Sequence, residues 1–148
     1  MSYIVSTGLV LAASAALGMS VVHQDQIDHH TGPVAVEYRA DIAITHKQVG
    51  AVAPAGVASS LRCDWAATMA VERQAVAASG TRLVRNIDSG PVVSGTRPGW
   101  CGTSRRAITR EVSGKAADMK SHLVVLAQED KETLRAELDR VHGEQRAG

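Results

Sequence analysis

The sequence predicts an α+β fold: a small antiparallel sheet of three to four strands within residues 34–97, then a C-terminal amphipathic helix or bent helix pair, with one disulfide. Residues 34–46 alternate between apolar and polar side chains, which is typical of a half-buried strand. From residue 104 onward, apolar residues recur every three or four positions, as in a helix that buries one face. The only two cysteines, Cys63 and Cys101, can join the sheet to the start of the helix.

Length and composition fit one domain with a thin core. The chain has 148 residues and 45% are hydrophobic, but alanine and valine dominate and phenylalanine is absent. Alanine buries little area, and burial contributes only about 25 cal/mol per Å², so a covalent staple matters for stability. The net charge of +1 indicates no polyanionic partner for the molecule as a whole, although residues 80–120 carry eight basic and three acidic side chains.

The N-terminal segment, residues 1–20, is expected to be a signal peptide. An apolar, uncharged run, Ile4–Leu17, precedes two candidate cleavage positions, after Gly18 and after Ser20, each with small residues at the required spacing. No basic side chain precedes the run, so two alternatives stay open: an uncleaved membrane anchor over residues 4–22, and a buried helix. The expected location is periplasmic or secreted, with an N-terminally anchored protein as the alternative.

Residues 21–33 are polar and rich in histidine, and we expect them to form a flexible mature N-terminus. Imidazole and carboxylate groups bind Cu, Ni or Zn, and the candidate ligands are His23, Asp25, His29 and His30. Cleavage after Ser20 would also make His23 the third residue of the mature chain. Its imidazole, the free amine and the two intervening backbone amides would then form a square-planar Cu(II) or Ni(II) site. The alternative is a solvated tail without a metal.

Residues 34–142 are expected to form a single α+β domain. After the first strand, residues 60–78 fit either a strand or a helix; we prefer the strand because it puts the polar side chains on one face. Residues 82–87 and 91–96 predict two short strands, and the residues between them, Asp88-Ser89-Gly90, predict a hairpin turn.

The C-terminal third predicts two helices, near residues 104–113 and 115–142, separated at Gly114. Thr103 or Ser104 is the expected N-cap. Gly143 is expected to end the second helix and leave a frayed tail, residues 143–148. The apolar stripe loses regularity near Asp130, which argues against a continuous coiled coil, but it leaves open whether the helix packs on its own sheet or in a dimer.

Two features next to the cysteines are candidates for a functional surface. Trp65 and Trp100 are expected to pack on the disulfide as core residues, with an exposed platform for a glycan or peptide as the alternative. Four arginines form a candidate anion site, with a solvated, internally ion-paired helix face as the alternative; they are Arg97, Arg105, Arg106 and Arg110.

The sequence contains none of the common catalytic signatures, so no catalytic or cofactor-binding residue is assigned. The expected function is that of an exported, non-enzymatic domain that binds or inhibits an envelope macromolecule, either an anionic polymer or another protein; nucleic acid is a less suitable partner because aromatic residues are few. The alternatives are a metal-binding or metal-handling protein that uses the N-terminal histidines, and a small hydrolase with an unrecognised site.

Overall fold

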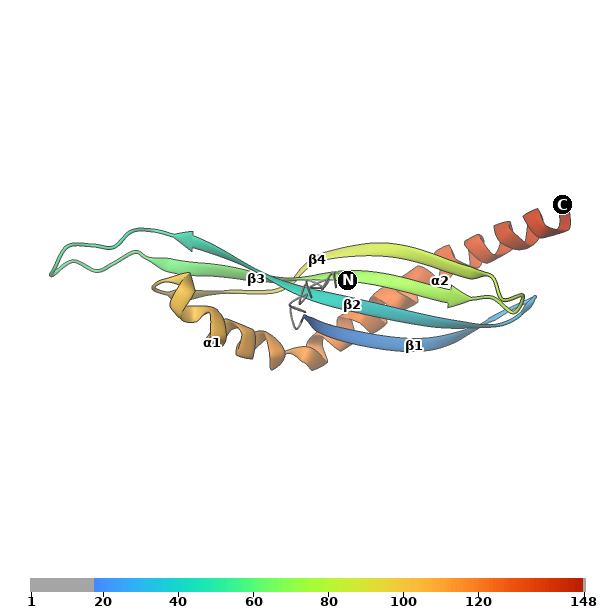
Figure 1. The fold of residues 1–148 in the computed structure, drawn as a ribbon, viewed down its shortest axis with the longest axis horizontal. Coiled ribbons are helices and arrows are strands. Elements are labelled where there is room, and N and C mark those ends of the chain that lie inside the picture. Colours follow the sequence, from blue (N-terminus) through green and yellow to red (C-terminus); the bar gives the residue numbers. More distant parts are fainter. Residues whose placement is uncertain (1–17, 148) are drawn as a thin grey trace, which may run out of the picture.

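A computed structural model describes residues 18–147, and it confirms the predicted fold class. Four antiparallel strands form one sheet in the order of the sequence, and two helices follow (Figure 1). The elements are β1 (Met19–His29), β2 (Gly32–Val49), β3 (Arg62–Val76), β4 (Arg82–Pro98), α1 (Cys101–Ser113) and α2 (Ala116–Ala147). The expected signal peptide or anchor lies almost entirely outside the described residues.

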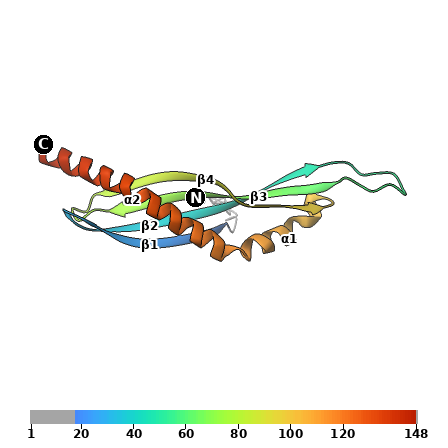
Figure 2. The same ribbon diagram turned by 180° about the vertical axis from the view of Figure 1, so that it is seen from behind.

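Both helices lie on one face of the elongated sheet, as the view from behind shows (Figure 2). The core lies between the sheet and the two helices, because alternate residues of β2 and β3 point to this face and meet the apolar stripe of the helices. No helix formed by the described residues lies on the other face of the sheet. No helix in residues 18–147 is both long and apolar enough to cross a membrane.

The expectation of a flexible segment at residues 21–33 is wrong, because most of this segment belongs to β1. This strand pairs with β2 over its whole length, from Met19 opposite Ile42 to His29 opposite Gly32. Apolar and polar residues alternate only weakly in this strand, and Ile27 is its one fully buried residue. The backbone ladder therefore holds β1 at the sheet edge, together with Lys120, which donates to the carbonyl of Val22.

The strand interpretation of residues 60–78 is confirmed, whereas the hairpin expected at Asp88-Ser89-Gly90 is wrong. Residues 82–98 form one continuous strand, β4, with an irregular register against β3: Thr68 pairs with Pro91 but Ala70 pairs with Asp88. A second shift lies next to it, because Ala67 pairs with Val93, so two extra residues of β4 are accommodated as a bulge. Gly90 adopts a φ of 66°, which suits a bulge as well as a turn.

The helix pair is confirmed and its break lies at Gly114, but both outer ends differ from the prediction. The first helix begins at Cys101, and the hydroxyl of Thr103 donates to the carbonyl of Trp100 rather than capping the helix (2.9 Å). The second helix continues through Gly143 to Ala147, so the tail is helical. A glycine costs a helix interior only about 1 kcal/mol.

The loop that connects β2 to β3, residues 50–61, projects beyond the sheet as an arm (Figure 1). β1 pairs with β2 only as far as Ile42, whereas β2 and β3 remain paired to Val49 and Arg62. The connecting loop, residues 50–61, contains no charged residue, and Val52 and Val57 are exposed at its tip.

Candidate functional site

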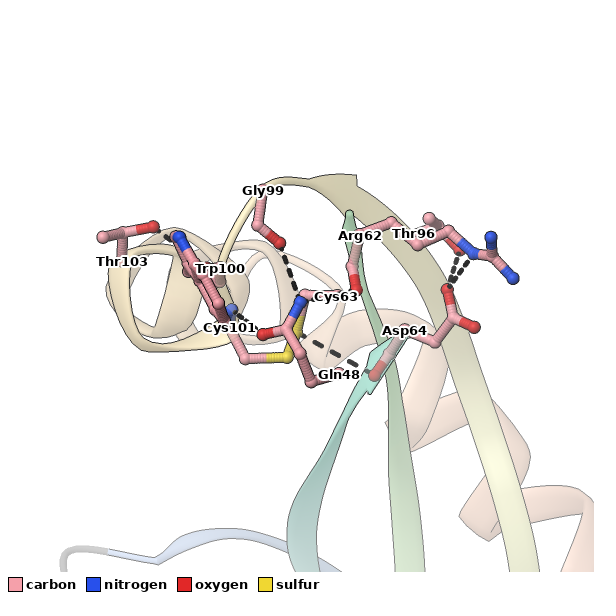
Figure 3. Close-up of a disulfide and its surroundings, with 9 residues drawn as sticks. All are labelled: Gln48, Arg62, Cys63, Asp64, Thr96, Gly99, Trp100, Cys101 and Thr103. Carbon is pink, nitrogen blue, oxygen red and sulfur yellow. Dashed lines mark hydrogen bonds and ion pairs between the residues drawn. A yellow bond between two sulfur atoms is a disulfide. The ribbon is translucent and has the colours of Figure 1, made fainter. Parts of the chain in front are cut away.

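The disulfide fastens the start of α1 to the sheet at the base of this arm (Figure 3). Cys63 on β3 and Cys101 at the first residue of α1 are both buried, and their Cα atoms lie 4.9 Å apart. The side chain of Gln48 on β2 reinforces this junction. Its oxygen accepts the backbone N–H of Cys101 (2.7 Å), and its amide donates to the carbonyls of Arg62 (2.9 Å) and Gly99 (3.1 Å). Such a disulfide is compatible with an extracellular or periplasmic location.

The two tryptophans beside the cysteines have different environments, so the expectation that both belong to the core is only half right. Trp65 is buried, and its ring lies so close to Gly95 that a Cβ added there would be 2.7 Å from a ring carbon. Trp100 is 55% exposed, because it immediately precedes α1 and only the neighbouring Cys101 turns towards the sheet.

The four candidate anion-binding arginines differ in their ion pairing. Arg105, Arg106 and Arg110 are exposed on α1, and none of them forms an ion pair within residues 18–147. Arg97 lies on β4 and pairs with Glu111 of α1 at 3.0 Å. Three guanidinium groups of α1 thus have no ion-pair partner among the described residues, whereas that of Arg97 on β4 is paired.

The four candidate metal ligands are divided into two pairs. His23 and Asp25 lie on β1: the ring of His23 stacks on Tyr38 with centroids 6.3 Å apart, and Asp25 pairs with Lys131 of α2 at 3.3 Å. Burial raises the pKa of Asp25, but the backbone N–H of Gln26 and the charge of Lys131 outweigh this and the pKa is lowered. These side chains are therefore engaged in local contacts.

His29 and His30, at the β1–β2 turn, instead meet two residues of α2. Nε2 of His29 lies 2.8 Å from Oδ1 of Asp139, and Nδ1 of His30 lies 3.7 Å from the same oxygen. The ring of His142 meets the ring of His30 edge-on, with centroids 5.3 Å apart. Three imidazoles and one carboxylate thus come together from two parts of the chain, the β1–β2 turn and the C-terminal half of α2, which are 110 residues apart.

A buried ion network lies further along the interface between α2 and the sheet. Arg73 on β3 is completely buried and donates to Oδ2 of Asp130 (2.8 Å) and to Glu137. Asp130 also accepts the hydroxyl of Tyr38 on its Oδ2 (3.0 Å) and the guanidinium of Arg85 on its Oδ1 (2.6 Å). One aspartate of α2 thereby binds three strands.

The pKa values in this network are shifted in the direction that keeps it intact. Burial raises the pKa of Tyr38, and the negative charge of Asp130 adds to the effect. Burial alone would lower the pKa of Arg73, but its bonds to Asp130 and Glu137 outweigh this, so the pKa is raised. Tyr38 therefore remains a neutral donor and Arg73 a cation.

An open groove of about 470 Å³ lies between β4 and α2, beside this network. Its lining includes Arg85, Ser89, His122 and Glu129, residue types that also occur in hydrolase sites. The hydroxyl of Ser89, however, donates to the carbonyl of Met69 (2.8 Å) on the neighbouring strand β3. This geometry gives no support for an activated serine.

Several of these residues left only weak signals in the sequence. Arg73 is at one of the alternate positions of β3 that point into the core, and Asp130 is the residue where the apolar stripe of the second helix becomes irregular. Together the two charged residues indicate a buried pair. Asp139 and His142 carry no local signal, because their proximity to the turn depends on how α2 crosses the sheet. Comparison of the chain with protein-family models, with curated proteins and with solved structures finds no match.

Proposed function

We propose that the chain is an exported, non-enzymatic domain that binds a polymer bearing phosphate or carboxylate groups through the outer face of α1. The observation that carries this proposal is the set of three exposed arginines without an ion-pair partner in residues 18–147; they are Arg105, Arg106 and Arg110. A guanidinium group can form two parallel hydrogen bonds to a carboxylate or phosphate. Three such groups on one short helix are therefore suited to anionic groups of a chain molecule.

The surroundings of α1 favour a binding surface at this end of the molecule. Arg106 and Arg110 are one helical turn apart, and the disulfide links the first residue of their helix to the sheet. Trp100 adds an exposed aromatic ring just before the first turn, and aromatic rings of this kind are common in recognition surfaces. We therefore expect the binding surface to be preformed.

Export is the part of the proposal that the disulfide supports, because disulfides persist in oxidising compartments. Both candidate cleavage positions, after Gly18 and after Ser20, lie at the beginning of β1. Cleavage at either one would leave nearly the whole β1–β2 ladder in place. The mass of the protein recovered from the extracellular or periplasmic fraction gives the mature N-terminus directly.

Binding is tested with purified protein, polyphosphate as the phosphate polymer and polygalacturonate as the carboxylate polymer, at increasing NaCl concentration. The triple variant R105Q/R106Q/R110Q should bind about tenfold more weakly, because three exposed ion pairs are lost and surface ion pairs are individually weak. Binding should also weaken with salt.

The matched control is R82Q/R140Q/R146Q, which removes the same charge from exposed arginines elsewhere. It should change the affinity less than about twofold, since distant surface charges are screened. Equal losses in both triple variants would mean that only net charge matters, and the proposal would then be wrong. Tighter binding to single-stranded DNA than to either polymer would also contradict it.

A further inference from the structure

We propose that the β1–β2 turn and the C-terminal half of α2 together bind a divalent transition-metal ion, for which Zn²⁺ is the best match. The ligands are His29, His30 and Asp139, with His142 as the fourth donor. This site is separate from the arginines of α1, so the two proposals stand or fall independently.

The first argument is geometric. One ligand atom from each of His29, His30 and Asp139 lies within 4.8 Å of the other two. In a tetrahedral zinc site with bonds of about 2.0–2.1 Å, the ligand atoms are about 3.3 Å apart. The two distances to Oδ1 of Asp139, 2.8 Å from His29 and 3.7 Å from His30, fall on either side of this value. Small side-chain rotations are enough to place three donors around one ion.

The second argument is the support of His29. Its side chain is only 5% exposed, and its Nδ1 lies 2.6 Å from the hydroxyl of Thr31. A ligating histidine is usually held in this way, because a hydrogen bond at one ring nitrogen orients the other nitrogen towards the metal. Here Nε2 is the nitrogen that faces Asp139. One ligand is thus preformed by the turn itself.

The remaining donors make the site accessible and complete its coordination. The side chains of His30 and Asp139 are 62% and 60% exposed, so an ion can enter from solvent. His142 follows Asp139 by three residues on α2, which places both on neighbouring positions of one helix face. Its ring is already in contact with His30. The resulting set of three imidazoles and one carboxylate consists of donors that Zn²⁺ commonly uses.

The bound ion would join two parts of the chain that are 110 residues apart. It would fasten α2 to the sheet at the turn between β1 and β2, whereas the disulfide fastens α1 at the base of the arm. The site therefore has a structural effect that can be measured even without a biochemical activity: the metal should raise the melting temperature.

The test is titration of the oxidised protein with Zn²⁺ by calorimetry, and with Co²⁺ by its visible absorption. We expect one ion per chain, a tetrahedral Co²⁺ spectrum and a higher melting temperature. The variants D139N and H30N should each bind at least about tenfold more weakly. H23Q/D25N is the matched control, because it removes the two donors that β1 holds away from the site.

The absence of one-to-one binding by the wild-type protein would overturn the proposal. It would also be overturned if H23Q/D25N lost as much affinity as D139N, or if neither D139N nor H30N had any effect. Circular dichroism of the metal-free variants establishes that they are folded. Should D139N fail this control, H30N still decides the question, since the side chain of His30 is largely in solvent.

Discussion

Replacing Asp130 by asparagine should destabilise the protein more than any substitution of an exposed residue. The side chain of Asp130 is 3% exposed and that of Arg73 is 0% exposed, and the two lie 2.8 Å apart. The substitution preserves the shape of the side chain but removes the charge that balances Arg73. Removal of one partner of a buried ion pair costs about 3–5 kcal/mol because the other charge stays buried.

The network around the pair places the expected loss at the lower end of this range, at about 3 kcal/mol. Glu137 remains to balance Arg73, and the side chain of Arg85 is 40% exposed, so it can turn towards water. The hydroxyl of Tyr38 can still donate to the amide oxygen of the asparagine. A loss of about 3 kcal/mol is nevertheless a large part of a total stability of about 5–15 kcal/mol.

The assay is urea denaturation of the oxidised protein, followed by circular dichroism and tryptophan fluorescence. The matched control is E132Q on the same helix, where the side chain is 83% exposed and pairs with Arg135 alone within residues 18–147; it should change the stability by less than about 0.5 kcal/mol. The cycle formed by D130N, R73M and the double variant should give a coupling energy of about 2 kcal/mol or more.

Two results would refute this reasoning. The first is a stability of D130N within about 1 kcal/mol of the wild type, which would mean that water or Glu137 compensates the charge of Arg73 completely. The second is strict additivity of D130N and R73M, which would mean that the two side chains do not interact in solution. Either result would remove the ion network as a determinant of how α2 docks.

Three further predictions concern the rest of the interface. The C63S/C101S variant should lose about 4 kcal/mol in urea denaturation, because the disulfide closes a separation of 38 residues. The G95A variant should lose about 1–3 kcal/mol and shift the fluorescence spectrum, because the new methyl group collides with the ring of Trp65. Since the pKa of Tyr38 is raised, the unfolded chain loses this proton first, and stability should fall by about 1.4 kcal/mol per pH unit above pH 10, but not in Y38F.

The controls for these predictions are simple. Wild-type protein treated with a reductant should match C63S/C101S, and equal stability of the oxidised and reduced forms would contradict the role of the disulfide. S94A, next to Gly95 but exposed, should retain wild-type fluorescence. If the stability of wild type and Y38F fell equally above pH 10, lysines alone would cause the loss and the role of Tyr38 would be refuted.

The strands and helices were predictable wherever one face is buried and the other is in solvent. Residues 34–46 and 60–78 alternate because they lie in the middle of the sheet, where every second side chain meets the helices. β1 was missed because it is an edge strand whose pairing depends on backbone hydrogen bonds, which leave no pattern in the side chains. Gly90 predicted a turn, although it lies in a bulge, because a glycine can supply the positive φ that both structures need.

The candidate sites were predictable only to the extent that their residues are neighbours in the sequence. His29 and His30 were recognised together, and so were the arginines of α1. Asp139 could not be added from the sequence, because its position depends on the angle at which α2 crosses the sheet. Arg73 and Asp130 were detectable in principle, since each puts a charge where the pattern calls for an apolar residue, and such exceptions are satisfied in pairs.

The sparse core explains why the docking of α2 depends on polar contacts. Of its 32 residues, six are buried, and one of these is Asp130. A helix with so few large apolar contacts gains little specificity from burial alone, because an apolar stripe can slide along an alanine-rich sheet at small cost. Charged and hydrogen-bonding partners are directional and fix one position. Asp130 fixes the middle of α2 against three strands, and Asp139 fixes its last turns against the β1–β2 turn. A metal ion at the second contact would therefore secure an arrangement that the ion network has already selected.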